Sequence, residues 1–326
     1  MTNKALQEQY LRRILNSKVY DVAIESPLEE AMSLGRKLGN RFLLKREDLQ
    51  NVHSFKIRGA YNKMSQMPRS ALEKGVLAAS AGNHAQGVAF SAREMGVRAV
   101  ICMPEAAPQV KVEATRSMGA EVVLVPGTYD DAYDEALRLQ GIHGYTFVHP
   151  FNDEAVIAGQ GTVALEILEE LPDTDAIVCA VGGGGLISGI AYAAKMLKPD
   201  IRIYGVQAQG APSMFMSFAS GYIRRMDTVH TIADGIAVKE PGCITFDYVQ
   251  KYVDDIFTVR DGEIAAAIAG MMRKEKIVSE GAGAAPVAAA LVERIPDLSK
   301  EKNVVCVVSG GNIDLPRLLE LLKGNK

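Results

Sequence analysis

Short apolar runs alternate with longer segments of mixed apolar and polar residues along almost the whole chain. The apolar runs are continuous and rich in Val and Ile, which is typical of parallel strands buried on both faces. The alternation predicts an α/β fold with parallel sheets and flanking helices. We expect strands at residues 41–45, 76–79, 99–103, 121–125, 145–148, 176–181, 202–207, 255–259 and 304–308, and helices at residues 85–95, 155–171, 186–197, 263–274 and 284–294.

The distribution of these strands predicts the domain organisation, because no internal repeat or long linker marks a boundary. About four of the expected strands fall between residues 66 and 150, and the others lie outside that range. A chain of 326 residues is long enough to divide into two domains. We therefore expect a small α/β domain at residues 66–150, inserted into a larger cofactor-binding domain formed by residues 1–65 and 151–326.

Composition excludes several classes of function. Hydrophobic residues make up 48% of the chain and charged residues 23%, as in ordinary soluble proteins. The net charge of -3 argues against nucleic-acid binding, which needs clustered Lys and Arg. No apolar run has the length of a signal peptide or a membrane span. The four cysteines are scattered without a CxxC pair, so we expect no zinc site or disulfide, and a cytoplasmic location.

A run of four glycines is the strongest single signal for ligand binding. Gly182, Gly183, Gly184 and Gly185 join a buried-strand pattern to an expected helix that begins at Leu186. Glycines at this place let backbone N–H groups approach an anion, and the helix dipole adds attraction. The run matches neither the GxGxxG fingerprint nor the phosphate loop that ends in Lys-Ser/Thr. A tight structural turn is the alternative interpretation.

Polar residues in four other segments are candidates for a site. Lys56 lies between a Ser-Phe pair and a Gly-Ala pair, although an isolated lysine is usually a surface charge. Asn83 and His84 follow an apolar run and begin a helix, as a substrate-carboxylate site or as a simple helix cap. Ser309 follows the last apolar run, where its hydroxyl could bond a ring nitrogen or lie in a turn. Glu280 is either a site acid or a favourable first-turn charge.

A lysine, an asparagine loop and a glycine run are together the parts needed to hold pyridoxal phosphate, as aldehyde, ring-hydroxyl and phosphate partners. In their order along the chain, these segments resemble the serine/threonine dehydratase family of fold-type II pyridoxal-phosphate enzymes. That resemblance implies a two-domain, tryptophan synthase β-like fold. The segments that carry it are Lys45-Arg46-Glu47-Asp48, Ser54 to Ala60, Ser80 to Gly87, Val156-Ile157-Ala158-Gly159-Gln160-Gly161-Thr162, Val181 to Leu186, Ile232-Ala233-Asp234-Gly235, Val253-Asp254-Asp255-Ile256 and Ser309 to Asp314.

The resemblance also implies a role for each candidate residue. Lys56 forms the Schiff base with the cofactor and acts as the general base on the substrate. Asn83 meets the ring hydroxyl, and Ser309 faces the ring nitrogen, which a serine leaves largely neutral, so that prompt elimination is favoured. The implied cofactor-binding residues are Phe55, Lys56, Asn83, Gly182, Gly183, Gly184, Gly185, Leu186 and Ser309, and the implied substrate-binding residues are Ser80, Asn83 and His84.

The implied reaction is the deamination of L-threonine to 2-oxobutanoate and ammonia, with L-serine dehydration as a side activity. Serine racemases of the family carry serine where this chain has Ala81, and they bind a divalent metal through acidic residues that the segment Gln207 to Ser213 lacks. We therefore expect no divalent-metal site, while a monovalent cation stays possible. The alternatives are a serine racemase, a β-replacement pyridoxal-phosphate synthase and a cofactor-free α/β binding protein.

Two further expectations concern the biological setting. The segment Val52-His53-Ser54 looks more like the biosynthetic than the catabolic branch of the family, which indicates isoleucine biosynthesis. Biosynthetic threonine deaminases of the family usually carry a further C-terminal regulatory domain, whereas this sequence ends soon after Asn312, as in a naturally short enzyme or a truncated catalytic domain. In either case we expect no inhibition by isoleucine. We expect a homodimer or homotetramer that acts on a small amino acid.

Overall fold

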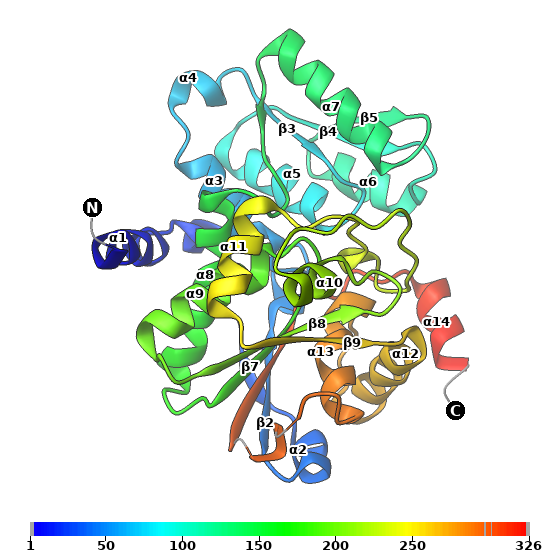
Figure 1. Cartoon of the computed structure of the whole chain (residues 1–326). Helices are drawn as coiled ribbons and strands as arrows, with labels where there is room; N and C mark the ends of the chain where they lie inside the picture. Colours follow the sequence, from blue (N-terminus) through cyan, green and yellow to red (C-terminus); the bar gives the residue numbers. More distant parts are fainter. Residues whose placement is uncertain (1–2, 297, 301, 324–326) are drawn as a thin grey trace.

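The strands of the protein form two separate sheets in the computed structural model, which describes residues 3–296, 298–300 and 302–323. One sheet has six strands in the order β1-β2-β10-β7-β8-β9, and the other has four in the order β5-β4-β3-β6 (Figure 1). The strands are β1 (Leu28–Glu30), β2 (Arg41–Arg46), β3 (Val76–Ala79), β4 (Ala99–Pro104), β5 (Glu121–Val125), β6 (Thr146–Phe147), β7 (Ala176–Ala180), β8 (Arg202–Ala208), β9 (Asp255–Val259) and β10 (Asn303–Val308).

Helices fill most of the chain between the strands. They are α1 (Asn3–Leu15), α2 (Met32–Leu38), α3 (Lys56–Ser65), α4 (Arg69–Leu72), α5 (Asn83–Met95), α6 (Gln109–Ser117), α7 (Tyr129–His143), α8 (Glu154–Glu170), α9 (Gly185–Leu197), α10 (Ser213–Ser220), α11 (Cys243–Tyr252), α12 (Asp261–Gly270), α13 (Gly281–Leu291) and α14 (Leu315–Lys323), with a short helical turn η3 (Asp234–Ile236). Among the residues that the structure describes, no helix has both the length and the apolar character needed to cross a bilayer.

Both sheets are parallel, with one exception. Strand β1 pairs antiparallel with β2 at the edge of the six-stranded sheet, and every other strand pair runs parallel. The sequence did not predict β1, because Leu28-Glu29-Glu30 is short and two of its three residues are exposed. The expected α/β fold with parallel sheets and flanking helices is confirmed.

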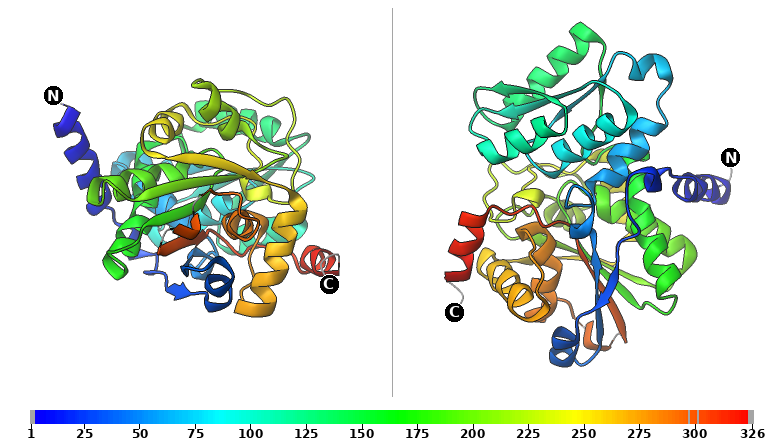
Figure 2. Two further views of the ribbon diagram at one scale, coloured as in Figure 1. Left: turned by 60° about the horizontal axis from the view of Figure 1, so that its bottom comes forward. Right: turned by 180° about the vertical axis from the view of Figure 1, so that it is seen from behind.

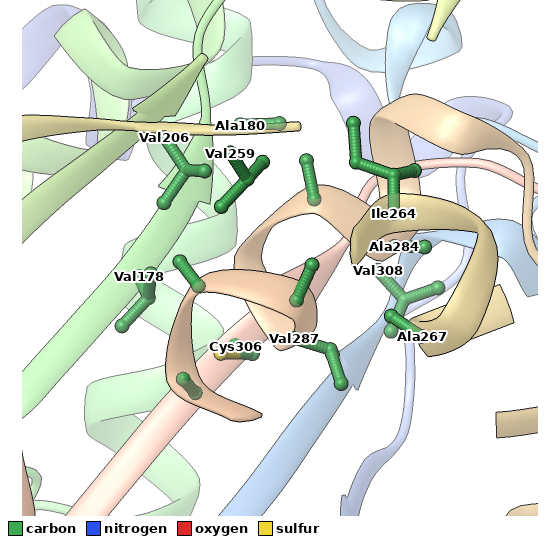
Figure 3. Close-up of a cluster of buried hydrophobic side chains, with 14 of the residues drawn as sticks. Val178, Ala180, Val206, Val259, Ile264, Ala267, Ala284, Val287, Cys306 and Val308 are labelled. Carbon is green, nitrogen blue, oxygen red and sulfur yellow. The ribbon is translucent and has the colours of Figure 1, made fainter. Parts of the chain in front are cut away.

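The six-stranded sheet is covered by helices on both faces (Figures 1 and 2). Val178 of β7 packs in a cluster with residues of α2, α12 and α13, shown in part in Figure 3. Its neighbours Ile177 and Cys179 pack on the opposite face with residues of α1, α8, α9 and α11. Successive side chains of a strand point to opposite faces, so a strand covered on both sides must be apolar throughout.

The four-stranded sheet lies at the other end of the molecule and is built from residues 76–147 (Figures 1 and 2). Helix α5 contributes to the core on one face, and α7 to the core on the other face. Strand β6 is shorter than the expected run at residues 145–148. The domain boundaries near residues 65 and 150 stay a prediction.

Glycines allow helices α3, α8 and α9 to come into close contact. A Cβ on Gly59 of α3 would lie 2.7 Å from the carbonyl oxygen of Val156 on α8. A Cβ on Gly159 of α8 would lie 2.8 Å from the Cα of Gly59, and one on Gly189 of α9 would lie 2.6 Å from the nitrogen of Gly161. Helices α3, α8 and α9 therefore pack backbone to backbone, closer than side chains at these positions would allow.

Candidate active site

The site forms where segments that follow three strands meet. In open α/β folds, ligands bind outside the carboxyl ends of the strands. Ser54 forms an isolated antiparallel bridge with Gly310, and the amide of Phe55 donates to the carbonyl of Ser309 at 3.2 Å. These bonds attach the start of α3 to the end of β10. The residue that follows them, Lys56, is the first residue of α3.

The environment of Lys56 lowers its affinity for a proton. Its Nζ donates to the carbonyl oxygen of Pro150 at 2.9 Å and lies 5.2 Å from the ring centre of Phe55. Burial lowers the pKa of Lys56 to about 8, although the nearby Glu280 opposes the shift. A lysine with this pKa is partly neutral near pH 8, as a nucleophile or a general base must be.

The four glycines present unpaired amides at the start of α9. Within the described part of the chain, none of the backbone N–H groups from Gly182 to Leu186 donates a hydrogen bond to the protein. Most of this segment is buried, and buried amides are normally paired. An anion at the helix N-terminus would satisfy them. The residues present therefore fit a phosphate group.

Close neighbours explain why glycines occupy this loop. Gly184 has φ +98°, in the left-handed region that favours glycine. A Cβ on Gly183 would lie 2.5 Å from ring atoms of Phe151. The carbonyl of Gly183 accepts hydrogen bonds from the hydroxyl of Thr245 at 2.5 Å and from the amide of Gly242 at 3.4 Å. The loop is thus fixed through its oxygens, and its amides stay free.

Asn83, the first residue of α5, is held from both sides. Its Oδ1 accepts a hydrogen bond from Asn312 Nδ2 at 2.8 Å, and its Nδ2 donates to Glu280 Oε1 at 2.8 Å. Glu280 is 4% exposed, and burial together with the charge of Asp234 raises its pKa to about 8. Glu280 therefore lies in the wall of the site, rather than serving only as a first-turn charge on α13.

His84 and Ser80 both lie beside Asn83, and each already has a partner within the protein. The buried His84 has its Nε2 2.7 Å from the carbonyl oxygen of Val148, so that nitrogen carries the hydrogen and donates it. Burial lowers the pKa of His84 to about 3, which keeps the ring neutral at ordinary pH. The hydroxyl of Ser80 accepts from the amide of Gly82 at 3.2 Å. Their contact with a substrate carboxylate stays a prediction.

Ser309 ends in the same region with an unused hydroxyl. Its side chain is 2% exposed, and in the part of the chain that the structure describes its Oγ makes no hydrogen bond. The neighbouring Ser54 has a buried hydroxyl without a partner as well. Buried hydroxyls are normally paired, so these two are consistent with a polar ligand in the site. The bond from Ser309 to a ring nitrogen stays a prediction.

Comparison with known proteins gives the family. A model described as "Pyridoxal-phosphate dependent enzyme" matches residues 19–310. The chain belongs to this family of pyridoxal-phosphate enzymes. Its similarity to named relatives confirms the resemblance to the serine/threonine dehydratases and the fold-type II architecture. Pyridoxal phosphate is therefore the cofactor of this enzyme.

Relatives of known name align with most of the chain. An "L-threonine ammonia-lyase" of Thermotoga maritima is 49% identical over 295 residues, which cover 90% of this chain and 73% of that protein. An "L-threonine dehydratase biosynthetic IlvA" of Burkholderia multivorans is 46% identical over 313 residues, covering 95% of this chain and 62% of that protein.

Solved structures agree with these relatives. The processed form of threonine deaminase isoform 2 from Solanum lycopersicum superposes with a TM-score of 0.94 at 43% identity, over 98% of this chain and 88% of that chain. A maize serine racemase superposes with a TM-score of 0.91 at 33% identity, over 97% and 96% of the two chains. The fold alone therefore does not separate a dehydratase from a racemase.

Sequence interpretation missed several residues of this pyridoxal-phosphate enzyme. Pro150 accepts the hydrogen bond of Lys56, Phe151 packs on the glycine loop, and Thr245 and Gly242 bond to its carbonyl. A proline that follows the strand β6 was a signal for the first two, because strand ends line the site. Thr245 lies within α11, and no motif in the sequence around it indicated that it belongs to the site.

The buried arginine on the helix that carries Lys56 has a structural role. Arg58 is fully buried, and its Nε donates to Glu47 Oε2 at 2.8 Å while its Nη2 donates to Glu166 Oε2 at 2.9 Å. Lys45 also pairs with Glu166, at 2.7 Å. These bonds hold α3 against β2 and α8 behind the site. Removing one partner from such a buried network is expected to be strongly destabilising.

Within the described residues, no three His, Cys, Asp or Glu side chains are grouped closely enough to hold a metal ion. In the segment where racemases are expected to carry acids, Gln207 Oε1 accepts from the amide of Phe215 at 2.7 Å. Ser213 donates its hydroxyl to the carbonyl of Val238 at 2.7 Å. A surface cleft of about 770 Å³ lies elsewhere, lined by residues such as Val110 and Leu319, and includes none of the site residues.

Proposed function

We propose that this enzyme is an L-threonine ammonia-lyase that produces 2-oxobutanoate and ammonia, with L-serine dehydration as a side activity. The observation that carries the proposal is the meeting of a partly neutral lysine, Lys56, with a loop of free glycine amides in a chain closely related to threonine ammonia-lyases. The lysine supplies a nucleophile and a base, and the amides supply an anion site. Other pyridoxal-phosphate lyases of this fold also need both.

Five contacts hold the cofactor in the proposed function. Lys56 binds its aldehyde, the amides of Gly182 to Leu186 bind its phosphate, and Ser309 donates to or accepts from its ring nitrogen. Asn83 donates to its ring hydroxyl. Phe55, whose ring lies 5.2 Å from the Lys56 Nζ, flanks the ring. The unpaired amides and the unused hydroxyl of Ser309 support these assignments.

When bound, pyridoxal phosphate withdraws electrons from the α-carbon of the amino acid. Lys56 would hold the aldehyde in the resting enzyme, and its neutral Nζ would take the α-proton of the amino acid, which balances the β-hydroxyl that leaves as water. Ser80, Asn83 and His84 hold the substrate carboxylate at the start of α5, where the helix N-terminus favours a negative charge. The neutral ring of His84 already donates its Nε2 hydrogen to Val148, so His84 meets the carboxylate through its backbone N–H in the first turn of α5.

Racemisation is the second candidate, because the chain superposes on a maize serine racemase with a TM-score of 0.91. A racemase needs an acid or base on each face of the planar carbanion. Lys56 supplies one face. Ala81, a methyl group in the loop before α5, offers no proton for the other face. We therefore propose elimination as the main reaction.

The test is a steady-state comparison of L-threonine, L-serine and D-serine, with 2-oxobutanoate, pyruvate and ammonia measured as products. L-threonine should give equal amounts of 2-oxobutanoate and ammonia. Lys56→Ala should abolish turnover, whereas Lys63→Ala on the same helix should keep it. Borohydride reduction followed by peptide mapping should place the cofactor on Lys56. A label on another lysine, or no 2-oxobutanoate from L-threonine, would refute the proposal.

The biological setting is part of the same proposal. We place the enzyme in the cytoplasm, in isoleucine biosynthesis, as a homodimer or homotetramer. The biosynthetic threonine dehydratases among its relatives support the pathway. Sedimentation velocity of the holoenzyme tests the assembly, and growth of an isoleucine auxotroph carrying this gene tests the pathway.

A further inference from the structure

Three side chains form a continuous line of hydrogen bonds across the site. Asn312 Nδ2 donates to the carbonyl of Val52 at 2.9 Å and to Asn83 Oδ1 at 2.8 Å. Asn83 Nδ2 then donates to Glu280 Oε1 at 2.8 Å. The three residues come from the loop after β10, the start of α5 and the residue before α13. The line therefore joins segments that are far apart in the sequence.

The fixed end of this line decides which way each amide points. The carbonyl of Val52 can only accept, so the Asn312 atom that faces it must be the nitrogen. The same nitrogen faces Asn83, whose facing atom is therefore the oxygen. The Asn83 nitrogen is thereby turned towards Glu280, which accepts one of its hydrogens. Among the described residues, none accepts the second hydrogen.

Close packing keeps the accepting end of the line in place. A Cβ on Gly310 would lie 2.8 Å from Glu280 Oε1 and 3.2 Å from Asn83 Nδ2. A Cβ on Gly235 would lie 3.3 Å from Glu280 Oε1. Glycines on two sides thus leave the space in which the carboxyl group reaches Asn83. Without these fixed partners, an asparagine amide can turn over, because its two ends are nearly equal in size.

We propose that Asn312 and Glu280 are positioning residues that fix the polarity of the Asn83 amide, so that one of its N–H groups is left as a donor for the ring hydroxyl of the cofactor. The inference rests on the role of Asn83 in the proposed function. Asn312 and Glu280 act through Asn83. When the ring hydroxyl has ionised, its oxygen can only accept, and an Asn83 amide turned the other way would then place two acceptors face to face.

The test measures cofactor affinity of the apoenzyme by equilibrium dialysis, and the absorbance maximum of the bound cofactor. Asn312→Asp keeps the size of the side chain but offers only acceptors to Val52 and Asn83. We expect its dissociation constant for pyridoxal phosphate to rise about tenfold, at the upper end of the loss of a neutral hydrogen bond, with a shifted absorbance maximum. Asn312→Ala should weaken binding less, because nothing then forces the amide to turn.

The acceptor end is tested by a matched pair. Glu280→Gln keeps an acceptor oxygen in place and should bind the cofactor within about twofold of the wild type, whereas Glu280→Ala should weaken binding about tenfold. If Gln and Ala weaken binding equally, acceptor geometry is not what Glu280 supplies, and the proposal is wrong. This pair also carries the test if Asn312→Asp does not fold.

A buried asparagine outside the line serves as the control. Asn62 of α3 is fully buried and donates to the carbonyl of Ala155 at 2.7 Å. Asn62→Ala should lower the melting temperature of the apoenzyme and leave the absorbance maximum unchanged. Wild-type affinity in Asn312→Asp, with weakened binding in Asn83→Ala, would overturn the inference and leave the proposed function standing. Wild-type affinity in Asn83→Ala would overturn the role of Asn83 itself.

Discussion

Gly87 on α5 lies directly against the backbone of Lys56, where a Cβ on residue 87 would come within 3.1 Å of the Lys56 carbonyl carbon and oxygen. Both α3 and α5 begin at the site, with Lys56 and Asn83 as their first residues. The contact therefore sets how closely the lysine and the asparagine approach each other. A larger residue at position 87 would separate the two helices close to their first residues.

Gly87→Ala should lower both stability and activity. The added methyl group meets backbone atoms that cannot rotate away, and overpacking of this kind costs about 1–3 kcal/mol of unfolding free energy. Denaturant unfolding and kcat for L-threonine measure the two effects. Gly141→Ala on α7 is the control, because its Cβ would meet nothing within 4 Å. That change should leave kcat unaltered and stabilise the protein by about 0.5–1 kcal/mol.

The raised pKa of Glu280 predicts how the apoenzyme responds to pH. Its pKa moves from an ordinary 4.5 to about 8, so between these values the folded protein holds a proton that the unfolded chain has lost. The contribution of this tighter proton binding to the free energy of unfolding is therefore fully present below pH 4.5. It is lost as pH rises towards 8, by at most about 1.4 kcal/mol per pH unit. Glu280→Gln should remove this slope in denaturant unfolding measured from pH 5 to 8.

The groups around Glu280 come from four other elements. Asp234 of η3 raises the pKa, while Asn83 of α5, Lys111 of α6 and Lys56 of α3 lower it. Lys56→Met should therefore raise the pKa further and move the loss of stability to higher pH. A wild-type apoenzyme whose stability does not depend on pH differently from Glu280→Gln would contradict the raised pKa.

Ser309→Ala should weaken cofactor retention and slow elimination, because the proposed bond to the ring nitrogen is lost. A neutral hydrogen bond contributes about 0.5–1.5 kcal/mol net, so affinity should fall about two- to twelvefold. The effect should thus be moderate, in contrast to the complete loss in Lys56→Ala. Dialysis against buffer and kcat for L-threonine measure it. Unchanged values for both would count against contact between Ser309 and the ring.

Ala81→Ser should add some racemase activity while dehydration stays dominant. The new hydroxyl would offer an acid on the face opposite Lys56, and the rest of the pocket is unchanged. Chiral chromatography of an L-serine reaction detects D-serine. The unmodified enzyme should produce almost none, and abundant D-serine from it would reverse our choice of dehydratase over racemase.

Chelation with EDTA should leave turnover of L-threonine largely intact. The segment Gln207 to Ser213 contains no carboxylate, and Mg²⁺ prefers hard oxygen ligands such as carboxylates. Steady-state rates before and after EDTA treatment check this expectation. Activity that collapses with EDTA and returns with Mg²⁺ would show that a divalent-metal site exists. Activation by K⁺ would not contradict the prediction.

The strands were predictable because burial on both faces leaves a strong pattern. The runs at residues 76–79, 121–125 and 255–259 match β3, β5 and β9 without change. Helix ends were less predictable: the helix expected at residues 263–274 ends at Gly270 and continues as a π-helical turn, Met271–Glu275. Where consecutive residues remain helical, the sequence carries no signal for a change in hydrogen-bond spacing.

The site was predictable to the extent that it uses strand ends. Asn83, the glycine loop and Ser309 follow strand ends directly, whereas Lys56 is separated from β2 by a further loop and is brought to the site by the bonds of Ser54 and Phe55 to the end of β10. The partners of these residues were not predictable, because hydrogen bonds such as Asn83–Glu280 and Lys56–Pro150 join positions separated by 197 and 94 residues. Only the packing of the two sheets reveals these pairs.

The glycine contacts between α3, α8 and α9 have a consequence for selection of the cofactor. They join the helix that starts with Lys56 to the helix that follows the glycine loop through close backbone contacts. This close packing restrains the separation between Lys56 and the loop amides. Under the proposed function, a shorter aldehyde such as pyridoxal would reach Lys56 but leave the amides without an anion, so the backbone would favour the phosphorylated vitamer over the free one.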